Sequence, residues 1–211
     1  MRPIAAFLMC VALVATLAGC KQGGGASGAV TDPDMRLGNP NAPVTVIEFA
    51  SLGCPICAKW NNDNFDAFKA KYIDTGKVYY IFREFLTGDQ PVAASGFLLA
   101  RCAGKDKYFQ VLDAVYHQEQ PLLETDQNAA KRDALVRVAE TAGLTEDQFQ
   151  TCVSNNDALL ALNDRAQKAG QKYNVDSTPT FVINGKTASG YQDMATMDKL
   201  IATAGPKPAN P

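Results

Sequence analysis

The chain has 211 residues, of which 46% are hydrophobic and 20% are charged, and its formal net charge is −2. This length and apolar content suit one globular domain with a buried core, and they exclude a disordered chain, a collagen and a protein with several membrane spans. Twenty basic residues against 22 acidic ones leave no excess positive charge to contact phosphates, so we expect no nucleic-acid partner. The six cysteines are too few for a small disulfide scaffold, so their positions must indicate what they do.

The first 19 residues have the layout of a secretory signal. Arg2 precedes an apolar run at residues 4–17, and the small residues Ala18 and Gly19 follow that run. The run is too short to span a bilayer comfortably. We therefore expect residues 1–19 to be a signal peptide that is removed.

The residue after this signal is Cys20. The sequence Leu17-Ala18-Gly19-Cys20 resembles the lipobox of bacterial lipoproteins, in which the cysteine becomes the first mature residue and carries lipid. An ordinary cleaved signal that happens to end beside a cysteine is the alternative. Lys21 is not the Asp that retains such lipoproteins at the inner membrane of enteric bacteria, which favours the outer membrane.

Residues 20–36 include a Gly-rich stretch with nothing to pack, so we expect them to form a flexible tether between the lipid and the domain. The folded domain is expected at residues 37–204, followed by a tail at 205–211.

The domain opens with a strand, a helix and a second strand. Residues 44–50 are β-branched and aromatic and are apolar on both faces, as in a central strand that is covered on two sides. Pro55 then stands where proline is preferred, in the first turn of a helix that continues to about Tyr72. Residues 78–85 form the second strand, which completes a βαβ unit.

No strand-like run occurs from Pro91 to about Tyr173, and we expect four or five helices there, one of them beginning with a capping box at residues 145–148. A strand at 178–183 follows, then an Asn-Gly hairpin turn with a partner strand at 186–189, and a helix at 193–204. The order predicts an α/β or α+β core with a large helical insert.

Cys54 and Cys57 stand one helical turn apart, with Cys54 at the cap. Unsatisfied N–H groups and the positive end of the helix dipole favour a thiolate at that position, and only the thiolate attacks a disulfide. The spacing alone is a weak signal, because half a zinc site or an inert disulfide also uses it. A zinc site would need two more ligands from His117, Cys102 and Cys152, and we expect no metal. The sequence has no Gly-rich phosphate loop either, so no cofactor is expected.

A strand, the Cys54-Pro55-Ile56-Cys57 sequence opening a helix, and Thr178-Pro179 before a strand together resemble the thioredoxin fold. The 121 residues between Cys57 and Pro179 are too many for a plain thioredoxin and match its DsbA-like branch, in which a helical domain is inserted, here at about 88–174.

That resemblance implies the roles of the site residues. Cys54 is similar to the attacking cysteine of the family, Cys57 to the buried resolving cysteine, and Pro179 to the cis-proline that faces the pair. Thr178 is similar to the residue whose backbone binds an extended substrate, with Pro55 and Ile56 also expected at the substrate.

Glu48 lies six residues before Cys54 on the doubly apolar strand, where thioredoxin-fold enzymes carry a buried carboxylate. Burial would raise its pKa and let it exchange a proton with Cys57. A solvated Glu at a strand edge is the alternative.

The second residue between the cysteines departs from the strongly oxidising members of the family. Those proteins have His there, whereas Ile56 offers no side-chain hydrogen bond to Cys54. We therefore predict a redox potential between those of DsbA and thioredoxin, about −120 and about −270 mV.

Cys102 and Cys152 both lie in the helical region. Two remaining thiols of an exported protein are more often paired than free, so we expect a structural disulfide between them. The alternative is a second redox pair, such as some members of the DsbA-like branch carry. His117 is expected at a helix end, where it can bind the last carbonyls.

These observations predict a periplasm-facing, lipid-anchored protein thiol-disulfide oxidoreductase, acting as a monomer on cysteine-containing exported proteins. The resemblance implies that a quinone-linked membrane oxidase regenerates a disulfide donor of this kind. A reductase or isomerase fed by a membrane thiol donor is the second hypothesis. A redox-inactive module that holds Cu(I) through Cys54 and Cys57 is the third.

Overall fold

The structure is a computed structural model that describes residues 34–118, 122–205 and 207. Five strands form one sheet in the order β1-β3-β2-β4-β5. β2 and β3 are parallel, and the other neighbouring pairs are antiparallel. The strands are β1 Met35–Leu37, β2 Val44–Ala50, β3 Val78–Glu84, β4 Thr180–Ile183 and β5 Lys186–Ser189. The expected signal peptide, Cys20 and most of the expected tether lie outside the described residues.

The expected start of the domain at residue 37 is two residues too late, because β1 already begins at Met35. Met35 is 3% exposed and pairs with Phe82 of β3. Arg83 donates two hydrogen bonds to the carboxylate of Asp34, both at 3.1 Å. Residues 34–36 are therefore part of the domain and not of a tether.

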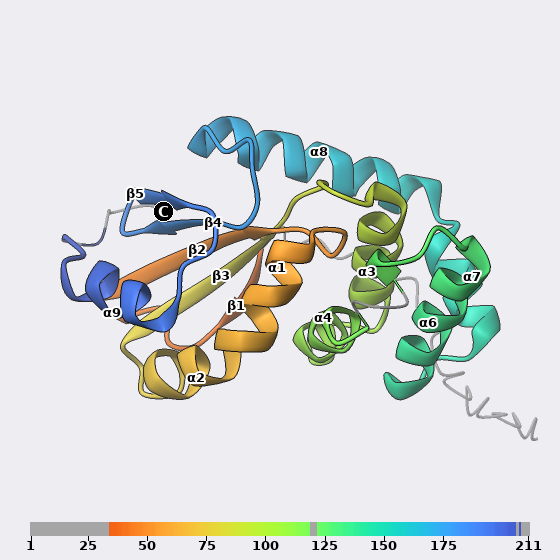
Figure 1. The fold of residues 1–211 in the computed structure, drawn as a ribbon, viewed down its shortest axis with the longest axis horizontal. Coiled ribbons are helices and arrows are strands. Elements are labelled where there is room, and N and C mark those ends of the chain that lie inside the picture. The colour runs from red at the N-terminus through yellow and green to blue at the C-terminus, as the bar shows by residue number, and fades with distance from the viewer. Residues whose placement is uncertain (1–33, 119–121, 206, 208–211) are drawn as a thin grey trace, which may run out of the picture.

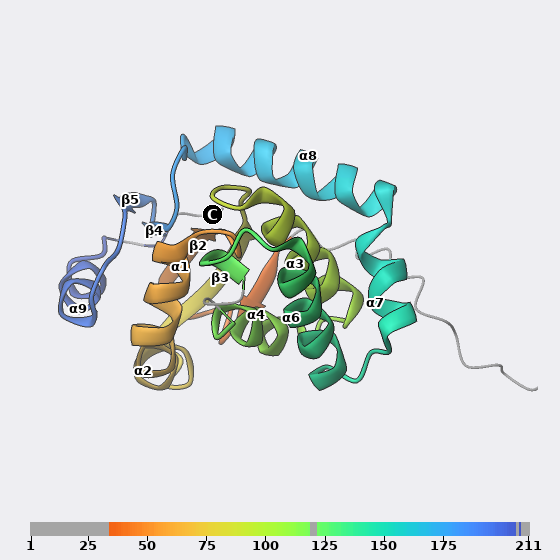
Figure 2. The same ribbon diagram turned by 45° about the vertical axis from the view of Figure 1, so that its right-hand side comes forward.

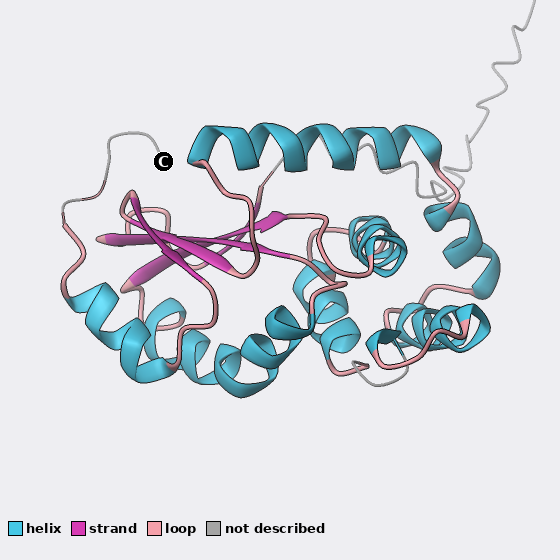
Figure 3. Ribbon diagram, turned by 45° about the horizontal axis from the view of Figure 1, so that its top comes forward, coloured by secondary structure: helices cyan, strands magenta, loops and turns pink. Residues whose placement is uncertain are grey.

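Helices cover both faces of the sheet (Figure 1). One face packs against a continuous helical segment from residue 55 to 73, in which α1 Pro55–Trp60 and α2 Asp66–Phe68 alternate with the π-helical stretches Asn61–Phe65 and Lys69–Ile73. Trp60 of this segment packs in a tilted arrangement against Phe181 of the sheet, and Phe68 packs edge-on against Tyr80. The other face packs against α8 Asn156–Tyr173 (Figure 3). Ile47, Phe49 and Val182 of the sheet belong to a buried cluster against which Ala169 and Tyr173 of α8 pack.

Four helices of the described residues form the insert beside the sheet (Figure 2). They are α3 Gln90–Cys102, α4 Tyr108–Tyr116, α6 Asn128–Thr141 and α7 Glu146–Val153. α7 begins with the predicted capping box, in which Thr145 and Gln148 each bind the other's backbone N–H. Together with α8, these helices span residues 90–173, close to the expected 88–174.

Glu84, at the end of β3, links the insert to the sheet. Its carboxylate is buried and accepts hydrogen bonds from Arg101 of α3 at 2.5 Å, from the Tyr108 hydroxyl of α4 at 3.1 Å and from Arg165 of α8 at 3.0 Å. Buried charges are tolerated when they are paired and fully hydrogen-bonded. Three helices of the insert are therefore fixed to one carboxylate of the sheet.

The C-terminal part forms the predicted hairpin and helix. Asn184 and Gly185 join β4 to β5 and both have positive φ angles, 44° and 87°, as the tight turn requires. The chain then enters α9 Met194–Ala202, which packs on the same face as α1 (Figure 1). Within the described ranges, none of the helices combines the length and the apolar character needed to span a membrane.

Candidate active site

The two cysteines stand where β2 passes into α1. Cys54 is the N-cap of α1, with φ −108° and ψ 114°, and Pro55 occupies the first helical position, where its missing N–H costs nothing. The Cys54 carbonyl accepts hydrogen bonds from the N–H groups of Cys57 at 3.0 Å and Ala58 at 3.1 Å. Cys54 is 8% exposed and Cys57 is fully buried. The cap therefore leaves Cys54 slightly exposed and holds Cys57 completely buried.

The loop before β4 lies against this pair. The Thr178–Pro179 peptide bond is cis, and the Cys54 thiol lies 3.6 Å from the Thr178 carbonyl oxygen, to which it donates. Residues 124 positions apart in the chain are thus brought together at the sulfur. Cys54, Cys57, Thr178 and Pro179 form a single site, and Pro55 and Ile56 lie on its exposed rim.

The two thiols have opposite acidities. Hydrogen bonds lower the pKa of Cys54 to about 5: the largest contribution comes from the Cys57 thiol, and the Thr178 side chain and the N–H groups of Cys57 and Ile56 add to it, against an opposing effect of burial. Burial raises the pKa of Cys57, and its hydrogen bond and charge interaction with Cys54 raise it further. At neutral pH the reduced site therefore holds a thiolate at Cys54 and a thiol at Cys57.

Glu48 has the buried position that the sequence predicts. It is 3% exposed, and burial raises its pKa to about 8 although the Tyr80 hydroxyl donates a hydrogen bond to it at 2.5 Å. Glu48 alternates along β2 with Ile47 and Phe49, so it points to the sheet face that packs against α1. The alternative of a solvated Glu at a strand edge is wrong.

Tyr80 and Tyr116 are polar groups near the site that the sequence did not indicate. Tyr116 is 3% exposed, and its hydroxyl has no hydrogen-bond partner within the part of the chain that the structure describes. Burial raises its pKa, and so do the charges of Cys57, Glu48 and Cys54. Both tyrosines occupy core positions. The sequence pattern there indicates only that an aromatic ring fills the core, and it does not indicate that the hydroxyl group lies near the site.

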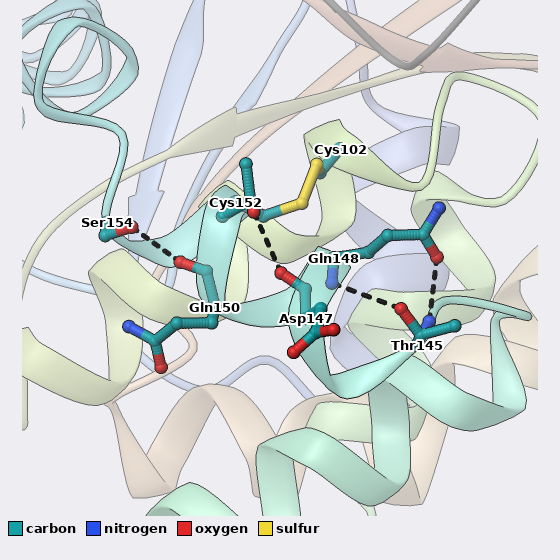
Figure 4. The surroundings of a disulfide bond; sticks show 8 residues. Cys102, Thr145, Asp147, Gln148, Gln150, Cys152 and Ser154 are labelled. Atoms are coloured by element: carbon teal, nitrogen blue, oxygen red, sulfur yellow. Dashed lines mark hydrogen bonds between the residues drawn. A yellow bond between two sulfur atoms is a disulfide. The ribbon is translucent and has the colours of Figure 1, made fainter.

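Cys102 and Cys152 are joined by a disulfide, with their Cα atoms 6.0 Å apart. Cys102 ends α3 and Cys152 lies in α7, one helix turn beyond the capping box of Thr145 and Gln148 (Figure 4). The bond thus ties two helices of the insert.

His117 lies at the end of α4 as expected, with its Nδ1 atom 2.9 Å from the Asp113 carbonyl oxygen. No group of three or more His, Cys, Asp or Glu side chains in the described residues is arranged to hold a metal ion.

Comparison with known proteins agrees with this geometry. The sequence model of a family described as Thioredoxin matches residues 30–203. A Rickettsia bellii protein provisionally named a protein-disulfide oxidoreductase is 30% identical over 178 residues, which cover 82% of this chain and 66% of that protein. The disulfide bond formation protein D of Bacillus subtilis is 27% identical over 78% of this chain and 74% of its own length.

The crystal structure of Wolbachia pipientis α-DsbA1 superposes with a TM-score of 0.73 and 28% identity, over 81% of this chain and 90% of that one. The matched region spans less than two thirds of the Rickettsia relatives, 66% in R. bellii and 57% in R. conorii. The superposition confirms the predicted α/β fold with inserted helices. The chain belongs to the thioredoxin family, and its fold is similar to that of the family's DsbA-like members.

Proposed function

We propose that the protein is a thiol-disulfide oxidoreductase of the bacterial cell envelope that forms disulfides in exported proteins through Cys54 and Cys57. The observation that carries this proposal is the contrast between the two sulfurs, a slightly exposed one with a pKa near 5 and a fully buried one whose pKa is raised. Disulfide exchange needs such a pair, because one sulfur must be a good nucleophile and leaving group at the surface while the other waits to resolve the intermediate.

In the oxidising direction, a client thiolate attacks the Cys54 sulfur of the Cys54–Cys57 disulfide. A bond forms between the client sulfur and Cys54, and the Cys57 sulfur leaves with the electron pair. Because the pKa of Cys57 is high, its sulfur takes a proton, which the Glu48 carboxyl, mostly protonated at neutral pH, supplies directly or through water. A second client thiolate then attacks the client sulfur of the mixed disulfide, which completes the client disulfide and releases Cys54 as a thiolate.

The acidity of Cys54 supports this direction. A thiol of low pKa leaves faster, and its thiolate stabilises the reduced enzyme, which makes the disulfide a stronger oxidant. A pKa near 5 lies between the values of about 3.5 for DsbA and about 7 for thioredoxin, so an intermediate potential is expected. The exposed Ile56 side chain, 47% accessible beside the sulfurs, offers an apolar contact to an unfolded client.

Cys54→Ser and Cys57→Ser variants test the proposal. Cys57→Ser keeps the sulfur that bonds to the client but removes the sulfur that can release the client by attacking Cys54. It should therefore accumulate mixed disulfides with clients on non-reducing gels, whereas Cys54→Ser should not. A reductase or isomerase would also trap clients but would be found reduced in the cell. A Cu(I)-holding module predicts that both variants lose metal and that neither traps a client.

The envelope location and the lipid anchor are part of the proposal. The signal-like residues 1–19 and Cys20 in its lipobox-like setting support export and acylation, and the Cys102–Cys152 disulfide supports an oxidising compartment. We assign residues 20–33 as the tether, the outer membrane as the favoured site, and a quinone-linked membrane oxidase as the recycling partner of a monomeric enzyme. Labelling with a fatty acid tests the anchor: wild type should carry the label and Cys20→Ala should not.

A further inference from the structure

The loop between β3 and α3 lies directly against the active-site loop. The Asp89 N–H donates to the Gly53 carbonyl at 2.8 Å. A Cβ atom added at Gly53 would lie 2.1 Å from the Asp89 carbonyl oxygen, and one added at Gly88 would lie 1.9 Å from the Gly53 oxygen. Only glycine permits this approach at either position. Residues 87–89 are therefore held at a fixed distance from Cys54.

Ser51 is hydrogen-bonded to the backbone of Thr87 in this loop. The Ser51 side chain is fully buried, and its hydroxyl donates to the Thr87 carbonyl at 2.8 Å. The same oxygen accepts from the N–H groups of Thr87 at 3.3 Å and Gly53 at 3.2 Å. Both backbone polar groups of Thr87 are thus bound by one residue of the active-site loop, so the position of the Thr87 side chain is set by the loop that carries Cys54.

The Thr87 side chain points at Thr178. Their hydroxyl oxygens are 2.5 Å apart, and either atom can be the donor. Each hydroxyl has one proton. If Thr178 donates to Thr87, it has no proton left for a sulfur; if Thr87 donates to Thr178, the Thr178 proton is free to point elsewhere.

The state of Cys54 decides between these arrangements. A neutral thiol is itself a donor, and it donates to the Thr178 carbonyl at 3.6 Å. A thiolate only accepts, and the Thr178 side chain is among the groups whose hydrogen bond stabilises it. A hydroxyl that gives its proton to the thiolate still accepts a hydrogen bond on its oxygen, and among the described contacts Thr87 is the hydroxyl placed to donate one.

We propose that Thr87 is a positioning residue of the redox site: it donates its proton to the Thr178 hydroxyl and so turns the Thr178 proton toward the Cys54 thiolate. The proposal rests on the thiolate role of Cys54 in the proposed function. Chains of hydrogen bonds that end on a charge strengthen one another in a partly buried site. Thr87 thus stabilises the reduced enzyme without touching either sulfur.

The test measures the pKa of Cys54 in the reduced protein from thiolate absorbance at 240 nm against pH, with the oxidised protein as the blank. Thr87→Val keeps the shape and removes the hydroxyl, and it should raise the Cys54 pKa by about 0.5 to 1 unit, a roughly three- to tenfold fall in the thiolate-to-thiol ratio. Thr87→Ser keeps the hydroxyl and should restore the wild-type value. Thr187→Val, the same change on the exposed β5 strand, is the matched control and should leave the pKa unchanged.

Coupling to Thr178 separates this role from a structural one. Thr178→Val should raise the Cys54 pKa by itself, and adding Thr87→Val should then raise it no further, because the relay is already broken. A Thr87→Val pKa equal to wild type, or additive shifts in the double variant, would overturn the proposal. If Thr87→Val does not fold, Thr87→Ala carries the same prediction.

The proposed function can fail separately from this inference. The pKa readout requires only the reduced protein and no client. Absence of trapped clients with Cys57→Ser, together with an intact Thr87–Thr178 coupling, would reject the oxidoreductase function and keep the relay. Trapped clients with Cys57→Ser, together with no Thr87–Thr178 coupling, would reject the relay alone.

Discussion

Replacing Glu48 by Gln should change how the stability of the protein depends on pH. The ordinary carboxyl pKa of 4.5 applies to the unfolded chain, and burial raises the pKa to about 8 in the folded protein. Between these values the folded state holds a proton that the unfolded state has lost. The free energy of unfolding contributed by Glu48 is therefore complete below pH 4.5 and falls as the pH rises toward 8.

The size of the effect follows from the shift. Each pKa unit corresponds to about 1.4 kcal/mol, so the loss reaches about 3 kcal/mol at pH 7 and about 5 kcal/mol above pH 8. Gln keeps the shape and an oxygen that accepts from the Tyr80 hydroxyl, and it does not ionise. The free energy of unfolding of Glu48→Gln, relative to that of wild type, should therefore rise by about 3 to 5 kcal/mol between pH 4.5 and 8.

The assay is chemical denaturation across pH 4 to 9 with the Cys54–Cys57 disulfide intact, so that the Cys54 thiolate does not contribute. The quantity compared is the difference in unfolding free energy between Glu48→Gln and wild type, in which the other titrating groups cancel. Glu140→Gln on the exposed side of α6 is the matched control, and its difference should stay within about 0.5 kcal/mol at every pH. A Glu48→Gln difference that stays flat from pH 4.5 to 8 would refute the buried-carboxyl reasoning.

Three further outcomes follow from the structure. Alkylation of the reduced protein should show a thiol whose rate rises with a midpoint near pH 5, as the Cys54 pKa requires, and a midpoint near 9 would contradict the site electrostatics. Replacing Cys102 and Cys152 together by Ala should lower the unfolding free energy by about 4 kcal/mol, from the closure of a 50-residue loop, and leave the redox potential unchanged, whereas a shifted potential would favour the second-redox-pair alternative. Glu84→Leu should cost about 3 to 5 kcal/mol in urea denaturation, because it leaves the Arg101 guanidinium buried without its carboxylate, and a loss under 1 kcal/mol would contradict that role.

The parts of the fold that sequence predicts are those with strong local signals. The β-branched run of β2, the capping box of α7 and the Asn184-Gly185 turn each specify their own conformation. β1 has no such signal, because a three-residue strand has too little pattern. It forms through its pairing with β3 and through the bond between Asp34 and Arg83.

The residues of the candidate site also differ in whether the sequence alone predicts them. Cys54, Cys57 and the Thr178–Pro179 pair are recognised by their residue types and order. Thr87 is not, because an isolated threonine after a strand has no distinguishing pattern, and its importance arises only from contacts made across the fold. The same is true of Tyr116, which belongs to the insert and whose pKa is raised by burial and by the charges of the site.

The equilibrium potential of the Cys54–Cys57 pair in glutathione buffers, measured with the Cys102–Cys152 disulfide intact, decides whether the protein can donate disulfides. We expect a reversible two-electron couple above about −160 mV, because the reduced form is stabilised by an ionised Cys54. A potential below about −200 mV, or no reversible couple, would contradict a disulfide donor.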